Sequence, residues 1–194
     1  MKSINEEVNL VSRASVDAVL LQSLWESLIP AAETGWRRGP RLLDLGTGGG
    51  FPGLPLALAL TDAKMTLLDS RRAKTLSLQR MTAELGVKNV SIVHDRAETH
   101  AERLDVPYDT VVVRAVSVLP EVAQWCERLL KPGGTLLSWK GPEGEREAKA
   151  LDPDKWKLLY ALPVLPHRYV LVLEYKGDEA GKPDADAPET TVSE

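Results

Sequence analysis

The chain has 194 residues and a net charge of −4, and its 43% hydrophobic and 27% charged residues are ordinary for a globular domain. No apolar run reaches the roughly 20 residues that span a bilayer, and the first ten residues lack the apolar core of a secretory signal. The single cysteine, Cys126, excludes an internal disulfide bond. We therefore expect one soluble, cytoplasmic domain without a membrane partner.

The predicted elements begin with a helix and continue as alternating strands and helices. A helix packed on the sheet is expected over 16–29, because apolar residues recur there at helical spacing: Val16, Val19, Leu20, Leu24 and Leu28. Apolar runs without strict alternation predict buried parallel strands at 41–46, 64–69, 90–94, 109–114 and 134–139. Helical patterns cover 53–60, 72–86, 97–104 and 119–130, with stop signals at Gly86 and at the KPGG of 131–134. Two adjacent runs predict a terminal antiparallel pair at 157–162 and 168–175.

This order of elements predicts an α/β fold with one Rossmann-like domain and a mostly parallel, seven-stranded sheet. We expect a helical segment over 1–40, the ligand-binding domain over 41–176 and a disordered acidic tail over 177–194. The tail holds six acidic residues and one lysine, so the remaining chain has a net charge of +1. Any RNA binding must then come from local basic patches rather than from overall charge.

The stretch LLDLGTGGGFPGLPLALAL follows the first predicted strand and is rich in glycine. Gly46, Gly48 and Gly50 allow a sharp turn and bring the backbone close to a ligand. Asp69 ends the second strand, where a carboxylate accepts both hydroxyl groups of a ribose. Glu98, or Asp95, follows the third strand within reach of an adenine amine. Together these strand ends predict a nucleoside site.

Three ligand interpretations remain open for this turn. The spacing of Gly48, Gly50 and Gly53 matches the dinucleotide fingerprint, but Pro52 lies where helix amides would bind the phosphates. S-adenosylmethionine carries no phosphate, and the acid Asp44 suits its cationic groups better than a pyrophosphate. A turn that only packs the strand on the helix is the third alternative.

Six segments resemble the 16S rRNA guanine-N7 methyltransferase family, called RsmG or GidB. They are NLVSR (9–13), LLDLGTGGGFPGLPLA (42–57), LLDS (67–70), DRAE (95–98), VVRAVS (112–117) and LLSWKG (136–141). The resemblance covers about residues 9–176. It implies a class I S-adenosylmethionine-dependent methyltransferase that modifies N7 of one guanosine in 16S rRNA of the small ribosomal subunit.

The resemblance also implies roles for individual residues. The expected cofactor-binding residues are Gly46, Gly48, Gly50, Phe51, Asp69, Ala97, Glu98 and Arg114. Gly46 and Phe51 would line the methionine part, Asp69 the ribose, and Ala97 and Glu98 the adenine. Arg114 and Lys140 are the expected catalytic residues.

Basic residues near these positions are expected to contact RNA. Arg96 matches a basic position of the family. Arg71, Arg72 and Lys74 stand at a predicted helix start, where positive charge opposes the helix dipole, so either a phosphate partner or a solvated face explains them. Three positions depart from the family pattern: Ser23 replaces a histidine, Glu26 replaces an aspartate, and Ala73 stands where lysine is usual.

The chemistry of the expected reaction agrees with what the sequence lacks. Guanine N7 has a free lone pair and no proton, so methylation there requires alignment and exclusion of water rather than a general base. Cys126 falls within a predicted helix and is interpreted as a core residue. The three histidines are not at ligand spacing, so we expect no metal.

Two other functions remain open. The fold also suits a small-molecule methyltransferase, or a non-catalytic cofactor-binding assembly factor. We expect a monomer in each case.

Overall fold

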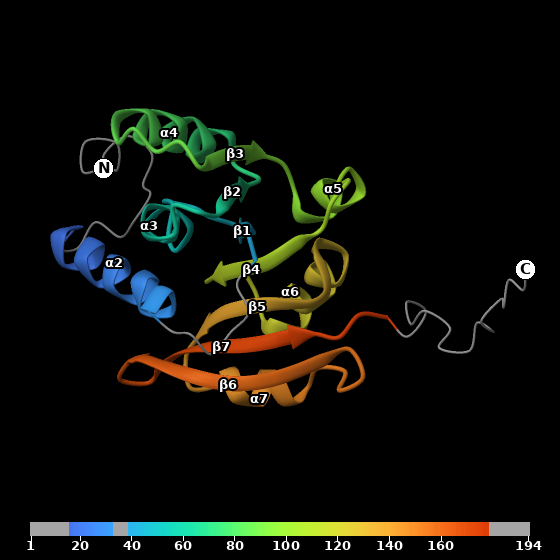
Figure 1. Cartoon of the computed structure of the whole chain (residues 1–194). Coiled ribbons are helices and arrows are strands. Elements are labelled where there is room, and N and C mark those ends of the chain that lie inside the picture. The colour runs from blue at the N-terminus through green and yellow to red at the C-terminus, as the bar shows by residue number, and fades with distance from the viewer. Residues whose placement is uncertain (1–15, 33–38, 179–194) are drawn as a thin grey trace, which may run out of the picture.

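Strands and helices alternate along most of the chain in the computed structural model, which describes residues 16–32 and 39–178 (Figure 1). The helices are α2 (Val16–Ala32), α3 (Gly53–Ala59), α4 (Arg72–Glu84), α5 (Ala97–Glu102), α6 (Leu119–Leu129) and α7 (Gly144–Lys149). The strands are β1 (Arg41–Leu45), β2 (Lys64–Asp69), β3 (Val90–His94), β4 (Tyr108–Arg114), β5 (Leu130–Lys140), β6 (Trp156–Leu165) and β7 (Arg168–Tyr175). Every element expected from the sequence is present, and α7 is an addition that no sequence pattern indicated.

The strands of the described ranges form one seven-stranded sheet in the order β3-β2-β1-β4-β5-β7-β6 (Figure 1). Strands β1 to β5 pair in parallel, whereas β7 runs antiparallel to both β5 and β6. The predicted fold class is therefore confirmed. The chain extends from β1 outward to β3 and then returns to β4 on the other side of β1. This reversal creates a switch point between β1 and β4, where sheets of this type bind ligands.

Two hydrophobic cores cover the two faces of the sheet. Leu42 and Val112 face a core shared with α3 and α4, whereas Leu43 and Val113 face a core shared with α5 and α6. Successive residues of a strand point to opposite faces, so both sets must be apolar here. This double coverage explains why the strands read as continuous apolar runs.

The predicted helix stops lie where α4 and α6 end. Gly86 follows α4 with a φ of +66°, and the Val87 N–H donates to Thr82 O at 3.0 Å, which closes a Schellman motif. α6 ends at Leu129, just before the KPGG segment. That segment lies inside β5, so this strand is longer than the predicted 134–139.

The expected apolar face of α2 is wrong at Leu24, whereas Val19, Leu20 and Leu28 of that face are half-buried. Leu24 is 40% exposed, whereas Ser23, Glu26 and Ser27 are buried. The helix also continues to Ala32, and it packs against α3 as well as against strand β6 of the sheet. Glu26 can be buried because Arg114 of β4 and Arg168 of β7 approach it from across the fold, whereas the Ser27 hydroxyl donates to Ser23 O within the helix. Periodicity within one helix contains no information on those distant partners.

Parts of the predicted domain organisation lie outside the described residues. The acidic tail from 179 onward is one such part, and its disorder stays a prediction, as do the bounds 1–40 and 41–176. Within the ranges that the structure describes, no helix is long and apolar enough to cross a membrane.

Candidate functional site

The glycine turn leaves β1 at the carboxyl edge of the sheet. Gly46, Gly48 and Gly50 have φ angles of +69°, +58° and +89°, which other residues rarely adopt. A Cβ on Gly50 would lie 3.0 Å from Leu78 Cδ2, so this glycine packs inward against α4. A Cβ on Gly48 would come no closer to another side chain than 3.5 Å, at Lys74 Nζ. The backbone at Gly48 therefore has space in front of it that a bound molecule can use.

Asp44 stabilises the turn from within. Its Oδ2 atom accepts hydrogen bonds from the Thr47 hydroxyl (2.7 Å) and the Gly53 N–H (2.8 Å). Its Oδ1 atom is buried without a hydrogen-bond partner in the described part of the chain. Burial raises the pKa of Asp44 from 3.8 to about 6, although both hydrogen bonds and the charge of Arg114 oppose the shift. Because Asp44 is 0% exposed, it shapes the turn and does not itself reach a ligand.

Asp69 links the end of β2 to the same turn. Its Oδ2 accepts the Gly48 N–H at 2.9 Å, and its Oδ1 accepts the Arg71 N–H at 2.8 Å. Each carboxylate oxygen retains further lone pairs after these bonds. Asp69 is therefore held in one orientation and can still accept hydrogen bonds from hydroxyl groups.

A cavity of about 150 Å³, the small cavity, lies beside Asp69. Four of the expected cofactor residues line it: Gly46, Asp69, Ala97 and Glu98. The other four expected cofactor residues do not: Gly48, Gly50, Phe51 and Arg114. Its lining also includes two residues that the sequence did not single out, Val116 and Trp125.

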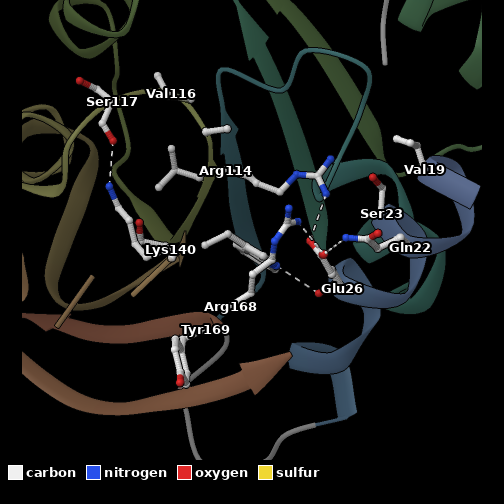
Figure 2. Close-up of a pocket in the computed structure, with 15 residues that line it drawn as sticks. Val19, Gln22, Ser23, Glu26, Arg114, Val116, Ser117, Lys140, Arg168 and Tyr169 are labelled. Atoms are coloured by element: carbon white, nitrogen blue, oxygen red, sulfur yellow. Dashed lines mark hydrogen bonds and ion pairs between the residues drawn. The ribbon is translucent and has the colours of Figure 1, made fainter. Parts of the chain in front are cut away.

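A second cavity, the large cavity, measures about 720 Å³ and lies between α2 and the ends of β4, β5 and β7 (Figure 2). Both expected catalytic residues, Arg114 and Lys140, line this cavity together with Glu26 and Arg168. Val116 lines the small and the large cavity alike. The two cavities thus adjoin and hold both expected catalytic residues and five of the eight expected cofactor residues, whereas Gly48, Gly50 and Phe51 line neither.

Glu26 is the centre of a charged cluster in the large cavity (Figure 2). Its Oε1 accepts hydrogen bonds from Arg168 Nη1 (2.9 Å) and Gln22 Nε2 (2.8 Å). Its Oε2 lies 3.7 Å from Arg114 Nη1. The Glu26 side chain is only 2% exposed, and two guanidinium groups balance its charge. Ser23 and Glu26 are two of the positions at which this sequence departs from the family pattern. Both are buried and both line the large cavity.

Arg114 extends from the end of β4 into the cluster. Its guanidinium carbon lies 5.5 Å from the centre of the Phe51 ring, at cation–π distance. Burial lowers the pKa of Arg114, and the negative charges of Glu26 and Asp44 oppose this shift. Phe51 and Arg114, which the sequence analysis both assigned to the cofactor, thus lie next to each other.

Lys140, the other expected catalytic residue, is engaged within the protein. Its Nζ donates to Ser117 O and to Glu147 Oε2, both at 2.8 Å. Glu147 also accepts the Leu119 N–H at 2.6 Å. Burial alone would raise the pKa of Glu147, but its bonds with Lys140 and Leu119 lower it overall. The arrangement gives Lys140 contacts that hold the start of α6.

The expected RNA-contacting residues lie at the start of α4 and directly before α5. Arg71 and Arg72 are exposed at the start of α4, whose first turn contains no acidic residue. Lys74 is partly buried, and burial followed by repulsion from Arg71 lowers its pKa. Arg96 is exposed and lines the small cavity. Their contact with RNA stays a prediction.

Three functional candidates escaped the sequence analysis: Arg168, Glu147 and Trp125. Arg168 is the charged first residue of the apolar run that forms β7, which is a signal that the sequence did offer. Glu147 lies in a charged segment without a distinctive pattern. Trp125 follows the core periodicity of α6, so only the tertiary structure shows that it lines a cavity.

Cys126 is confirmed as a core residue, because it is fully buried in α6 and burial raises the pKa of its thiol. His100 Nε2 lies 2.8 Å from the Tyr108 hydroxyl in a structural contact. Residues 16–32 and 39–178 contain no group of three or more histidine, cysteine, aspartate or glutamate side chains arranged for a metal ion.

Comparison with known proteins finds a family that this chain matches. The family model described as rRNA small subunit methyltransferase G (GidB) matches residues 1–165. A ribosomal RNA small subunit methyltransferase G of Chlorobium limicola is 38% identical over 149 residues, which are 76% of this chain and 66% of that protein. The protein of the same name from Synechococcus elongatus is 39% identical over 153 residues, which are 76% of this chain and 62% of that protein. The chain thus spans slightly less than two thirds of these relatives.

A solved structure agrees with the fold. The O-methyltransferase TomG of Streptomyces achromogenes, in complex with SAM, matches with a TM-score of 0.59 at 20% identity. The match covers 91% of this chain and 87% of TomG. At this level of identity the likeness extends to the fold alone.

Proposed function

Because the chain belongs to the rRNA small subunit methyltransferase G family, we propose that it methylates N7 of a specific guanosine in 16S rRNA, with S-adenosylmethionine as the donor. The enzyme would act in the cytoplasm as a monomer on rRNA of the small ribosomal subunit. One observation carries the proposal. Gly46, Asp69, Ala97 and Glu98 come from three different strand ends and meet at one cavity.

The residues present fit such a cofactor. Asp69 offers a fixed carboxylate for the ribose hydroxyls, since two backbone amides orient it. Glu98, which is exposed at the start of α5, supplies an acceptor for the adenine amine. S-adenosylmethionine supplies a methyl group on a positively charged sulfur, which is a good leaving group. The protein therefore has to bind, orient and shield rather than activate.

The large cavity suits the acceptor base. Arg114 and Arg168 present guanidinium groups there, and guanidinium groups pair with guanine O6 or with phosphate oxygens. Among the described side chains that line this cavity, the one carboxylate is that of Glu26. Two arginines and Gln22 already contact its oxygens. It is therefore not disposed to act as a general base. This arrangement is compatible with N7, which has no proton to remove.

We test the proposal by following labelled methyl transfer from S-adenosylmethionine to small subunits that lack the modification, and by mapping the product. Asp69→Ala should abolish transfer and weaken S-adenosylhomocysteine binding at least about tenfold, because a buried acceptor of two hydroxyls is lost. Arg114→Ala should fold normally and reduce turnover. Asp105→Ala is the matched control, since Asp105 is exposed before β4 at the opposite edge of the sheet. Normal S-adenosylhomocysteine affinity in Asp69→Ala would contradict the site assignment.

A further inference from the structure

Val116 separates the two cavities of the site. It lines both, and its Cγ2 lies 2.6 Å from the place where a Cβ on Gly46 would be. The methyl group of Val116 therefore rests directly on the first glycine of the turn. The small cavity, at about 150 Å³, is below the roughly 300 Å³ that small-molecule sites usually need. A donor that combines a nucleoside with an amino acid must extend past Val116.

The backbone around Val116 is strained and poorly covered. Ala115 has a φ of +55°, in the left-handed region that residues with a Cβ disfavour. Val116 is 39% exposed, and Val118 is 56% exposed. Apolar contacts therefore cover the segment 115–118 only in part. Polar contacts add to what holds it in position.

Those contacts come from Lys140 and Glu147, and from Glu121, whose carboxylate accepts the Ser117 hydroxyl. Lys140 Nζ binds Ser117 O, and Glu147 Oε2 binds both Lys140 Nζ and the Leu119 N–H. The two anchors stand directly after Val116 along the chain. Gly144, at the start of α7, packs closely against Lys140, because a Cβ on Gly144 would lie only 2.5 Å from Lys140 Cβ. The pair is mostly shielded from water, with side-chain exposures of 11% and 21%.

We propose that Val116 is a movable partition between the small cavity and the large cavity. Glu147 is the positioning residue that holds Val116 over Gly46, through its bonds with Lys140 and the Leu119 amide. This inference rests on the proposed function, because it assumes a nucleoside donor. The segment 115–118 has to move off Gly46 before the donor can occupy both cavities. The apparent affinity for the donor then equals the intrinsic affinity multiplied by the fraction of molecules in which Val116 has moved off Gly46.

The test measures S-adenosylhomocysteine binding to the full chain by calorimetry and by stopped-flow tryptophan fluorescence, for which Trp125 in the small cavity is a reporter. Glu147→Ala and Val116→Ala should each raise the association rate constant about five- to tenfold, because each weakens the closed arrangement. Glu143→Ala and Val118→Ala are matched controls. Glu143 lies beside α7 and pairs with Arg146, and Val118 lines neither cavity. Both controls should stay within about twofold of the wild type.

A double variant separates positioning from a merely structural role. If Glu147 acts through Val116, Glu147→Ala combined with Val116→Ala should bind no faster than either single variant. Glu147→Gln should stay near the wild-type rate, since its amide oxygen still accepts from Lys140 and Leu119. A simple loss of stability would instead lower the melting temperature without accelerating association.

The outcomes distinguish this inference from the proposed function. Wild-type association rates in both Glu147→Ala and Val116→Ala, with the wild type binding normally, would overturn the partition and leave the proposed donor intact. Additive acceleration in the double variant would overturn the link between Glu147 and Val116. A wild-type protein that binds no S-adenosylhomocysteine would overturn the proposed donor and this inference together.

Discussion

Two polar networks meet at the switch point of the sheet, and they are assembled in different ways. The first, the donor edge, comprises Asp44, Thr47, Gly48, Gly53 and Asp69, whose hydrogen bonds join residues 3, 9 and 21 positions apart. The second, the acceptor cluster, comprises Gln22, Glu26, Arg114 and Arg168, and its bond between Glu26 and Arg168 joins residues 142 positions apart. The donor edge is a local structure within one strand–helix–strand unit. The acceptor cluster forms only when α2 docks near β4 and β7, which follow it much later in the chain.

The two networks also treat buried charge differently. Asp44 of the donor edge has one oxygen without a hydrogen-bond partner in the described residues, and its pKa is raised to about 6. Glu26 of the acceptor cluster has a guanidinium group near each carboxylate oxygen. A buried charge without a nearby opposite charge destabilises the folded state. When a buried charge is paired, its removal leaves the partner charges uncompensated. Three substitutions sharpen this contrast.

The largest expected effect concerns Asp44→Asn as a function of pH. The folded-state pKa of about 6 exceeds the ordinary value of 3.8, so the contribution of Asp44 to stability is complete below pH 3.8 and is lost as pH rises through 6. Two pKa units correspond to about 3 kcal/mol. Relative to Asp44→Asn, the wild type should therefore lose about 3 kcal/mol of unfolding free energy between pH 4 and pH 8.

Urea unfolding of both proteins across this pH range measures the difference. Asparagine keeps an oxygen for Thr47 and Gly53, so the turn should stay intact. Parallel stability profiles for the two proteins would show that the charge of Asp44 is compensated after all.

A smaller effect is expected for Glu26→Ala. Removing the acid leaves Arg114 and Arg168 without their shared partner, but Arg168 is 56% exposed and regains water. We therefore expect a loss of about 2 kcal/mol, below the cost of breaking a fully buried pair. Glu84→Ala, at an exposed position near the end of α4, is the control. Equal unfolding free energies for the two variants would show that the acceptor cluster does not depend on its acid.

The smallest effect is expected for Leu24→Gln on α2. Because Leu24 is 40% exposed, the substitution should change the unfolding free energy by less than about 0.5 kcal/mol. Ile29→Gln is the matched control on the same helix, since Ile29 packs against the core and should cost about 2 kcal/mol. A large loss in Leu24→Gln would restore the apolar face that the sequence suggested.

Much of the donor edge was visible in the sequence because its partners are close along the chain. The glycines, Asp69 and the residues after β3 could be assigned to one edge, since parallel strands end together. The spacing did not reveal that Asp44 is enclosed by its own turn or that Gly50 packs on α4. Both facts depend on how tightly α3 and α4 fold back on β1.

The sequence by itself determined the order of strands and helices, the family and the position of the glycine turn, because these depend on local periodicity and on contiguous motifs. Only the tertiary structure decided which face of α2 is buried, which cations surround Glu26 and where Lys140 is anchored. The partners of Glu26 and Lys140 lie on other elements, up to 142 positions away for Arg168, so no local pattern encodes what compensates these buried charges. Val116 belongs to the same class, since it becomes a partition only where two cavities meet.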